Sequence, residues 1–368
     1  MSIRSIARSL GLLCLVLAGG ALAAAPAKSH APSAKAAKAP VGPSIILRGD
    51  HSTTRIYEAL AKAFEKAGDG RVTVQPFSTI SGLDAVHAGT ADVAASARPA
   101  MPGRAEEQGT NFYPVAWDAL VPIVEAANPV SNITLRQLHD VYLGRITNWK
   151  DLGGKDAPIN LDGVAAPLDG VEYSTRLLLF HYGDQNVSVS RMYVNTEKLE
   201  EDIELNANGL GMSTLSGVAH NPKVKMLSVE GVRASTASIA DGSYPLYSAI
   251  YLAARSDGVH NAEVEKFVAF ADSDAGKAVL REQGLVPNSD APDLSTSKQD
   301  ARIAFVEERL KPPMLTVQGR PVSAPNATLD YLTRSAPTAP GTQQARIEAA
   351  RLKAAKQPKA DPPADGGD

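Results

Sequence analysis

Cysteine is almost absent from this chain of 368 residues, and the only one, Cys14, lies close to the N-terminus. The segment around Cys14 has the features of a cleaved signal peptide, so the mature chain is expected to contain no thiol. Structural disulfides, thiol catalysis and cysteine-ligated metal sites are therefore excluded.

Aromatic residues are also scarce, at 5% of the chain, and neither sign of charge dominates, with 37 basic and 40 acidic residues and a net charge of -3. Proteins that bind DNA or RNA usually present a basic surface, and stacked aromatic rings hold single strands. The composition therefore argues against a nucleic-acid partner. A hydrophobic share of 44% still suffices for packed cores, which excludes a chain that is disordered throughout.

The sequence lacks the local motifs of catalytic and cofactor sites. Its 7 histidines show no metal-binding spacing. Neither the G-x-S-x-G nucleophile turn nor the G-x-x-x-x-G-K-[ST] phosphate loop occurs. We therefore expect no metal, no nucleotide and no other cofactor, and a protein that is not an enzyme.

The N-terminus reads as a secretory signal over residues 1–23. Arg4 and Arg8 precede a short apolar run over residues 11–18, and Ala21-Leu22-Ala23 forms a small-residue cleavage site. The apolar run is too short for a membrane span of about 20 residues. A periplasmic or secreted location follows as an expectation.

Composition divides the rest of the chain. Residues 24–43, rich in Ala, Lys, Pro and Ser, are expected to form a flexible linker, and residues 335–368 a disordered tail. Between them we expect a domain over residues 44–290 and a C-terminal extension over residues 291–334 with one amphipathic helix at 302–310.

Strand and helix patterns alternate within this domain, which indicates an α/β fold. The expected strands are residues 44–49, 72–76, 91–95 and 120–124. The expected helices follow residues 52–54 and 134, and cover residues 83–88, 176–182, 262–271 and 276–283. Strand-to-helix turns in both halves suggest two lobes facing one cleft.

Hydroxyl residues gather at three expected helix starts, at residues 52–54, at residues 78–82 and at Ser174-Thr175. Helix N-termini offer unpaired N–H groups and a partial positive charge, so several of them can converge on one small oxyanion. Helix capping alone uses the same residue types. The residues by themselves leave both interpretations open.

Several runs resemble the substrate-binding proteins of phosphate transporters, the PstS-like family. The most specific is Ile146-Thr147-Asn148-Trp149-Lys150-Asp151-Leu152-Gly153-Gly154, preceded by the run at residues 128–135. Further similar runs are residues 89–93, 96–99 and 52–54, and the closing stretch from residue 270 to residue 287.

The resemblance implies a two-lobed type II periplasmic binding fold with hinge strands, in which the lobes close on one oxyanion. It places lobe one at about residues 44–118 and 250–290, lobe two at about residues 125–245, and the crossing strands near residues 119–125 and 245–253.

The same resemblance implies which residues bind the anion. Hydroxyls of the three turns match family positions, and arginines nearby are candidates for a positive charge. The resulting ligand-binding candidates are Thr53, Thr54, Thr79, Ser81, Arg98, Ser174, Thr175 and Arg176.

One turn departs from the family pattern. Family members commonly read R-x-x-x-S-G-T in the lobe-two turn, whereas residues 169–175 place Asp169 at the arginine and Tyr173 at the serine. An arginine clamps an oxyanion by charge-assisted hydrogen bonds, and a carboxylate repels it. Glu172 is expected to add to this repulsion.

The leading hypothesis is a monomeric receptor that binds phosphate or a similar oxyanion and passes it to the membrane subunits of an ABC importer. The alternative is a scaffold or interaction protein of the cell envelope that keeps the fold and has lost or changed its ligand. A phosphatase is the least favoured, because no nucleophile and base are paired. Trp149 is expected to pack internally, and Asp118 to form hydrogen bonds at the hinge.

Overall fold

The computed structural model describes residues 44–101, 103–165 and 169–311, all within the compact unit Pro40–Asp368. The expected signal peptide, linker and tail, and the part of the extension from residue 312 to residue 334, lie outside the described residues.

The strands of the described part include all four that the sequence predicts. They are β1 (Ser44–Asp50), β2 (Arg71–Phe77), β3 (Val93–Ser96), β4 (Thr110–Glu125), β5 (Asn132–Ile133), β6 (Asn160–Val164), β7 (Arg191–Tyr193), β8 (Gly209–Thr214), β9 (Val224–Met226), β10 (Ser228–Val229), β11 (Tyr247–Arg255) and β12 (Val286–Pro287).

The helices are α1 (Thr54–Ala67), α2 (Thr79–His87), α3 (Leu135–Tyr142), α4 (Gly170–Phe180), α5 (Thr196–Ile203), α6 (Leu215–Val218), α7 (Thr236–Ala240), α8 (Asn261–Asp272), α9 (Asp274–Glu282) and α10 (Ser297–Leu310). The capping box that predicts α3 is present, with Thr134 accepting from the Gln137 N–H. Several helices begin earlier than expected, with α2 at Thr79, α4 at Gly170 and α10 at Ser297.

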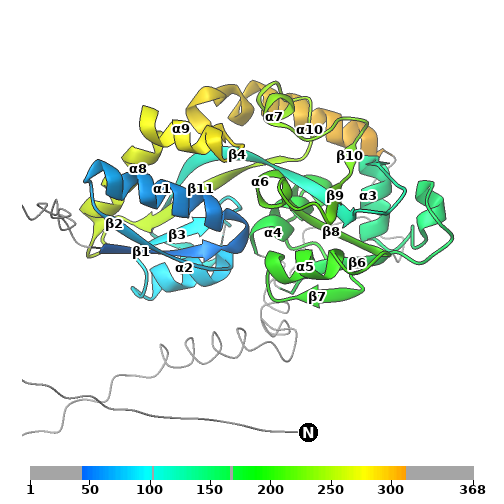
Figure 1. Ribbon diagram of the computed structural model, residues 1–368, viewed down its shortest axis with the longest axis horizontal. Coiled ribbons are helices and arrows are strands. Elements are labelled where there is room, and N and C mark those ends of the chain that lie inside the picture. The colour runs from blue at the N-terminus through cyan, green and yellow to red at the C-terminus, as the bar shows by residue number, and fades with distance from the viewer. Residues whose placement is uncertain (1–43, 102, 166–168, 312–368) are drawn as a thin grey trace, which may run out of the picture. The chain divides into compact units, whose positions relative to one another are not determined.

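One mixed sheet connects the two halves, in the strand order β2-β1-β3-β11-β4-β8-β6-β7. The long strand β4 pairs antiparallel with β11 from Thr110 to Ala119, and then with β8 from Leu120 to Ile123. The sequence predicted only the second part of β4. In Figure 1, β4 and β11 run between the half that contains β1 to β3 and the half that contains β6 to β8.

Each half has its own hydrophobic core, which gives the two-lobed α/β fold that the sequence predicts. In lobe one, the predicted stripe of Ile56, Leu60 and Phe64 on α1 is buried, and the Phe64 ring lies edge-on against Phe267 and Phe270 at 5.3 and 5.4 Å. In lobe two, apolar residues of α3 and α4 pack on β4 and β8. The residue limits given above for the lobes remain predictions.

Helix α10 packs on the lobe-two core through Val306 and Leu310. Its Arg302 lies over the Tyr247 ring at 4.0 Å and donates to the Tyr247 carbonyl at 2.5 Å. Because Tyr247 begins β11, the helix is fastened to a strand that joins the lobes.

Candidate functional site

Two helix starts, one from each lobe, meet at a single oxygen atom. Ser78 caps α2 in a capping box with Ser81. The N–H group of Ile80, the residue before Ser81, donates to Asp169 Oδ1 at 3.1 Å. Asp169 caps α4, and the same Oδ1 accepts from the Gly170 N–H at 3.2 Å. Helix starts carry free N–H groups and a partial positive charge, and here two of them share one side-chain oxygen as their acceptor.

A second carboxylate, Asp50, lies beside the first at the end of β1. Its Oδ1 accepts from the Ser52 N–H at 2.9 Å and the Ser52 hydroxyl at 2.6 Å, and its Oδ2 accepts from the Thr79 hydroxyl at 3.0 Å. A Cβ atom at Gly170 would lie 2.1 Å from Asp50 Oδ2. Only glycine therefore lets the start of α4 approach the end of β1 so closely.

Hydroxyls from both lobes line the same place. The Thr79 oxygen accepts from the Ala97 N–H at 3.1 Å, and the Ser174 hydroxyl donates to the Ala97 carbonyl at 2.9 Å. Ser248 on β11 lies 3.4 Å from the Ser174 hydroxyl. The structure thus brings together two of the predicted hydroxyl residues, Thr79 and Ser174, around Asp50 and Asp169.

Burial controls the charge of this cluster. Asp169 and Asp50 are only 2% and 3% exposed. Burial, together with the negative charge of Asp50, raises the pKa of Asp169 to about 8, while the Ile80 N–H and the Arg98 charge act in the opposite direction. The neutral form of Asp169 is therefore favoured at pH 7.

The remaining predicted hydroxyls have contacts within their own segments. Thr53 donates to the Asp50 carbonyl at 2.9 Å, and Ser81 donates to the Ser78 carbonyl at 3.0 Å as part of the capping box. The hydroxyl oxygen of Thr54 is buried without a hydrogen-bond partner among the described residues.

The two candidate arginines are engaged in buried ion pairs. Arg98 contacts Glu107 at 2.5 Å and lies 5.2 Å from the centre of the Tyr173 ring. Arg176 contacts Glu172 at 2.5 Å within α4. Glu172 is thus compensated by Arg176, so the extra repulsion that the sequence predicted from it is wrong.

The expected helix start at Ser174-Thr175 is also wrong. Both residues lie in the middle of α4, because the Asp169 carboxylate caps the helix one turn earlier. If the serine and glycine of the family pattern belong at the helix start, they correspond to Asp169 and Gly170. Asp169 then stands at the serine, and the expected arginine position falls on Ala165.

Sequence reasoning missed Asp50, the Ala97 backbone and Gly170 as parts of the site. Asp50 directly follows the strand predicted at residues 44–49 and precedes a hydroxyl run, which is a signal for a side chain at the carboxyl edge of a sheet. No sequence signal marks Ala97, because its backbone atoms make the contacts.

Further contacts between the lobes lie beside this cluster. Arg55 of α1 donates to the Ser216 carbonyl at 2.7 Å. The Ser216 side chain donates to Asp118 on β4, and burial raises the pKa of Asp118 to about 6. The predicted hydrogen bonding of Asp118 is confirmed, while its place at a hinge stays a prediction. The predicted packing of Trp149 is also confirmed, since its side chain is buried and donates to the Asn208 carbonyl at 3.0 Å.

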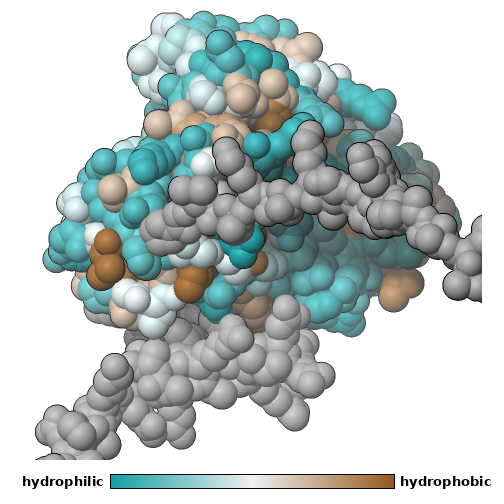
Figure 2. Space-filling model, turned by 60° about the vertical axis from the view of Figure 1, so that its left-hand side comes forward, coloured by the Kyte–Doolittle hydropathy of each residue, from teal (hydrophilic) through white to brown (hydrophobic). Residues whose placement is uncertain are grey.

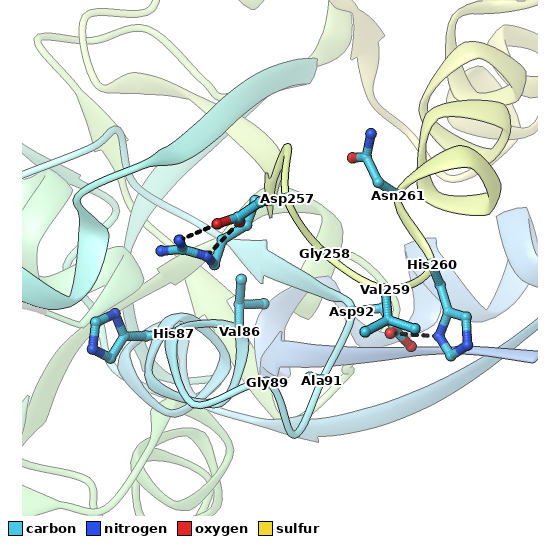
Figure 3. A pocket seen from close by; sticks show the side chains of 11 residues that line it. Val86, His87, Gly89, Ala91, Asp92, Asp257, Gly258, Val259, His260 and Asn261 are labelled. Carbon is cyan, nitrogen blue, oxygen red and sulfur yellow. Dashed lines mark hydrogen bonds and ion pairs between the residues drawn. The ribbon is translucent and has the colours of Figure 1, made fainter.

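A separate cavity of about 350 Å³ lies in lobe one, between the end of α2 and the loop that precedes α8. Its charged side chains pair with one another, Asp92 with His260 at 2.8 Å and Arg255 with Asp257 at 2.7 Å (Figure 3). His87 lies at the opposite end from His260 (Figure 3). Because these four side chains are engaged with one another, the cavity is a weaker candidate for a ligand-binding site than the two helix starts.

The described surface visible in Figure 2 is largely hydrophilic, with hydrophobic residues scattered over it. Within the described residues, no three histidine, cysteine or acidic side chains gather as metal ligands. In the same part of the chain, no helix combines the length and the apolar character needed to cross a bilayer.

Comparison with known proteins finds the same architecture and a related sequence. A family model described as a PBP superfamily domain matches residues 34–164. The phosphate-binding protein PstS of Bacillus subtilis is 27% identical over 284 residues, which are 72% of this chain and 86% of that protein. Protein SphX of Synechococcus elongatus is 27% identical over 264 residues, 66% of this chain and 77% of that protein.

Among solved structures, an ABC-type phosphate transport receptor from Vibrio cholerae superimposes with a TM-score of 0.52 at 27% identity. The match covers 66% of this chain and 99% of that one. These relatives are named as binding proteins or transport receptors, with the exception of SphX, whose name states no activity.

Proposed function

The chain belongs to the PstS-like family of substrate-binding proteins, and on this basis we propose that it binds a small oxyanion, phosphate or one of similar shape, without changing it chemically. The bound anion is delivered to the membrane subunits of an ABC importer. The place of action is the periplasm or the cell exterior, where a protein with a cleaved signal peptide would arrive.

One observation carries this proposal: N–H groups from the starts of α2 and α4 converge on one carboxylate oxygen, at 3.1 and 3.2 Å. The Asp169 oxygen lies where an oxygen atom of a bound anion would lie, so the donors already have the distances that such a ligand needs. Hydroxyls of Thr79 and Ser174 lie beside these donors and add hydrogen bonds without net charge.

Asp50 gives this site a basis for choosing among oxyanions. The described contacts use three of the roughly four acceptor positions of its carboxylate, which leaves one on the side of Thr79. Phosphate retains a proton at neutral pH and can donate it to a carboxylate, whereas sulfate has none to donate. We therefore expect phosphate to bind more tightly than sulfate.

Isothermal titration of the purified chain tests the proposal. Saturable heat with millimolar phosphate, and weaker heat with sulfate at the same concentration, is the expected result. If neither anion produces heat, and neither raises the midpoint of thermal unfolding, the receptor function is wrong.

The second candidate, an envelope scaffold or interaction protein, is favoured by the presence of Asp50 and Asp169 at the helix starts. The negative charge of Asp50 repels an entering anion, and the buried Asp169 carboxyl group already occupies the N–H donors that would bind it. Under this candidate, phosphate leaves the thermal midpoint unchanged in the natural chain and also in a variant that lacks the Asp169 carboxylate.

A further inference from the structure

The Asp169 carboxyl group makes a hydrogen bond across the two lobes, which Asp50 does not. Asp50 accepts from Ser52 and Thr79, and both of these belong to lobe one, as Asp50 does. Asp169 belongs to lobe two and accepts from the Ile80 N–H of lobe one. Of the two acids, only Asp169 therefore links the helix start of one lobe to that of the other.

We propose that Asp169 is an internal competitor of the solute: its carboxyl group occupies the oxyanion position between α2 and α4, holds the lobes together, and must be displaced before an oxyanion can bind. This inference rests on the proposed function for the identity of the solute. It assigns to Asp169 a regulatory role in that same site.

Close packing at the start of α4, next to the carboxyl group, supports this role. Gly170 lies against Asp50 and Thr79, where even a Cβ atom would be 2.1 and 2.9 Å from their oxygens. A buried acceptor that receives two N–H groups also satisfies donors that would otherwise lose their water partners on lobe closure. The lobes can thus pair in this way without a solute between them.

The effect on affinity follows from population arithmetic. If only a fraction of molecules has the carboxyl group displaced, the apparent affinity for the anion falls to that fraction of its intrinsic value. A closed form that outweighs the competent one by about ten to one weakens binding about tenfold. Removing the acceptor oxygen that the side chain of residue 169 places between the two helix starts should restore this factor.

A comparison of the natural chain with two variants at position 169 separates competition for the oxyanion position from simple helix capping. Asp169→Ser keeps a good capping residue but lacks the carboxyl group, and its side chain is one bond shorter. Asp169→Asn keeps an oxygen at the same reach, so its amide can still accept from the Ile80 and Gly170 N–H groups. Ser273→Ala removes the cap of α9, a helix of lobe one outside the site, and serves as the control for capping loss.

Phosphate titration is the first measurement. We expect Asp169→Ser to bind phosphate at least tenfold more tightly than the natural chain, and Asp169→Asn and Ser273→Ala to stay within about twofold of it. If all four chains bind with equal affinity, the inference is wrong while the proposed function stands.

The second measurement reports lobe opening without any ligand. Dyes attached at Leu205→Cys and Val259→Cys, both highly exposed at 85% and 93%, report the distance between the lobes in a chain that also carries Cys14→Ser. We expect lower energy transfer for Asp169→Ser than for the natural chain, and equal transfer for Asp169→Asn.

The two measurements separate the two ways of failing. If no chain binds phosphate but Asp169→Ser lowers energy transfer, the proposed solute is wrong and the link between the lobes is supported. If energy transfer is the same in every chain, the role of Asp169 in holding the lobes together is overturned, whatever the titration shows.

Discussion

The starts of α2 and α4 both have a side-chain cap, but the two capping side chains differ in chemistry. Ser78 caps α2 with a neutral hydroxyl and leaves the Ile80 N–H pointing across to the other lobe. Asp169 caps α4 with a carboxylate, which reaches across and takes that N–H. A hydroxyl cap leaves the N–H groups of a helix start available to an anionic ligand, whereas the Asp169 carboxyl group supplies an acceptor oxygen of its own to both helix starts.

The largest effect is expected from breaking the ion pair inside α4. Arg176→Met leaves the buried Glu172 carboxylate without its partner, which is 2.5 Å away in the natural chain. Loss of one partner of a buried pair costs about 3–5 kcal/mol of unfolding free energy. Urea unfolding measures it.

An exposed pair of lobe one provides the control for this prediction. Arg71→Met breaks the pair with Glu65, whose side chains are 49% and 47% exposed, and should cost less than about 1 kcal/mol. Equal losses in the two variants would contradict the structural role assigned to the Arg176 pair. A double variant, Arg176→Met with Glu172→Gln, should recover part of the loss because no buried charge remains.

A smaller loss is expected from disturbing the contact between the two helix starts. In Gly170→Ala the new methyl group would meet Asp50 Oδ2 at 2.1 Å, so the start of α4 must move away from β1. Overpacking of this kind costs about 1–3 kcal/mol. The same substitution at Gly258, where the nearest atom is 3.3 Å away, should change the urea midpoint little.

The pH dependence of stability separates the acidic cap from the neutral one. Burial raises the pKa of Asp169 to about 8 in the folded chain, above the value of 3.8 of an exposed aspartate. Folding therefore favours the protonated form, and this stabilisation is complete below about pH 4 and is lost as the pH rises to about 8. The unfolding free energy should fall less between pH 5 and pH 8 in Asp169→Asn than in the natural chain.

Other buried acids contribute to the same pH range, so the comparison must be made between the two chains. Burial raises the pKa of Glu200 and of Asp162 to about 7 each. Because both acids remain in Asp169→Asn, the difference between the two pH profiles isolates position 169. Identical profiles would show that Asp169 is charged in the folded chain at pH 7.

The sequence predicted the architecture better than the site. The stripe of Ile56, Leu60 and Phe64 predicts α1 because helix periodicity is a local property, and the capping box predicts α3 for the same reason. The first part of β4 was missed because its partner β11 is more than 100 residues away along the chain, beyond the reach of local patterns.

The site depends on contacts that no local pattern encodes. Thr79 and Ser174 both contact the Ala97 backbone, and Gly170 lets the start of α4 lie close enough to β1 for this. The hydrogen bond that joins the two helix starts runs from Ile80 to Asp169. The resemblance matched the lobe-two turn to Ser174-Thr175, which lie in the middle of α4 and not at its start. The side-chain cap at Asp169 was the signal that would have corrected this.

The smallest effect is expected from a substitution at Thr175. The family resemblance implies that this residue binds the ligand, but it lies inside α4 and not at its start. Its hydroxyl is fully buried in α4 and has no hydrogen-bond partner among the described residues. Thr175→Val replaces this hydroxyl by a methyl group of similar size, so the unfolding free energy should stay the same or rise by up to about 1 kcal/mol. Phosphate affinity should also be unchanged, because α4 begins one turn earlier and its free N–H groups lie there. A severalfold loss of affinity in titration would instead place the Thr175 hydroxyl on the anion, and the register that the resemblance implied for this turn would then be the right one.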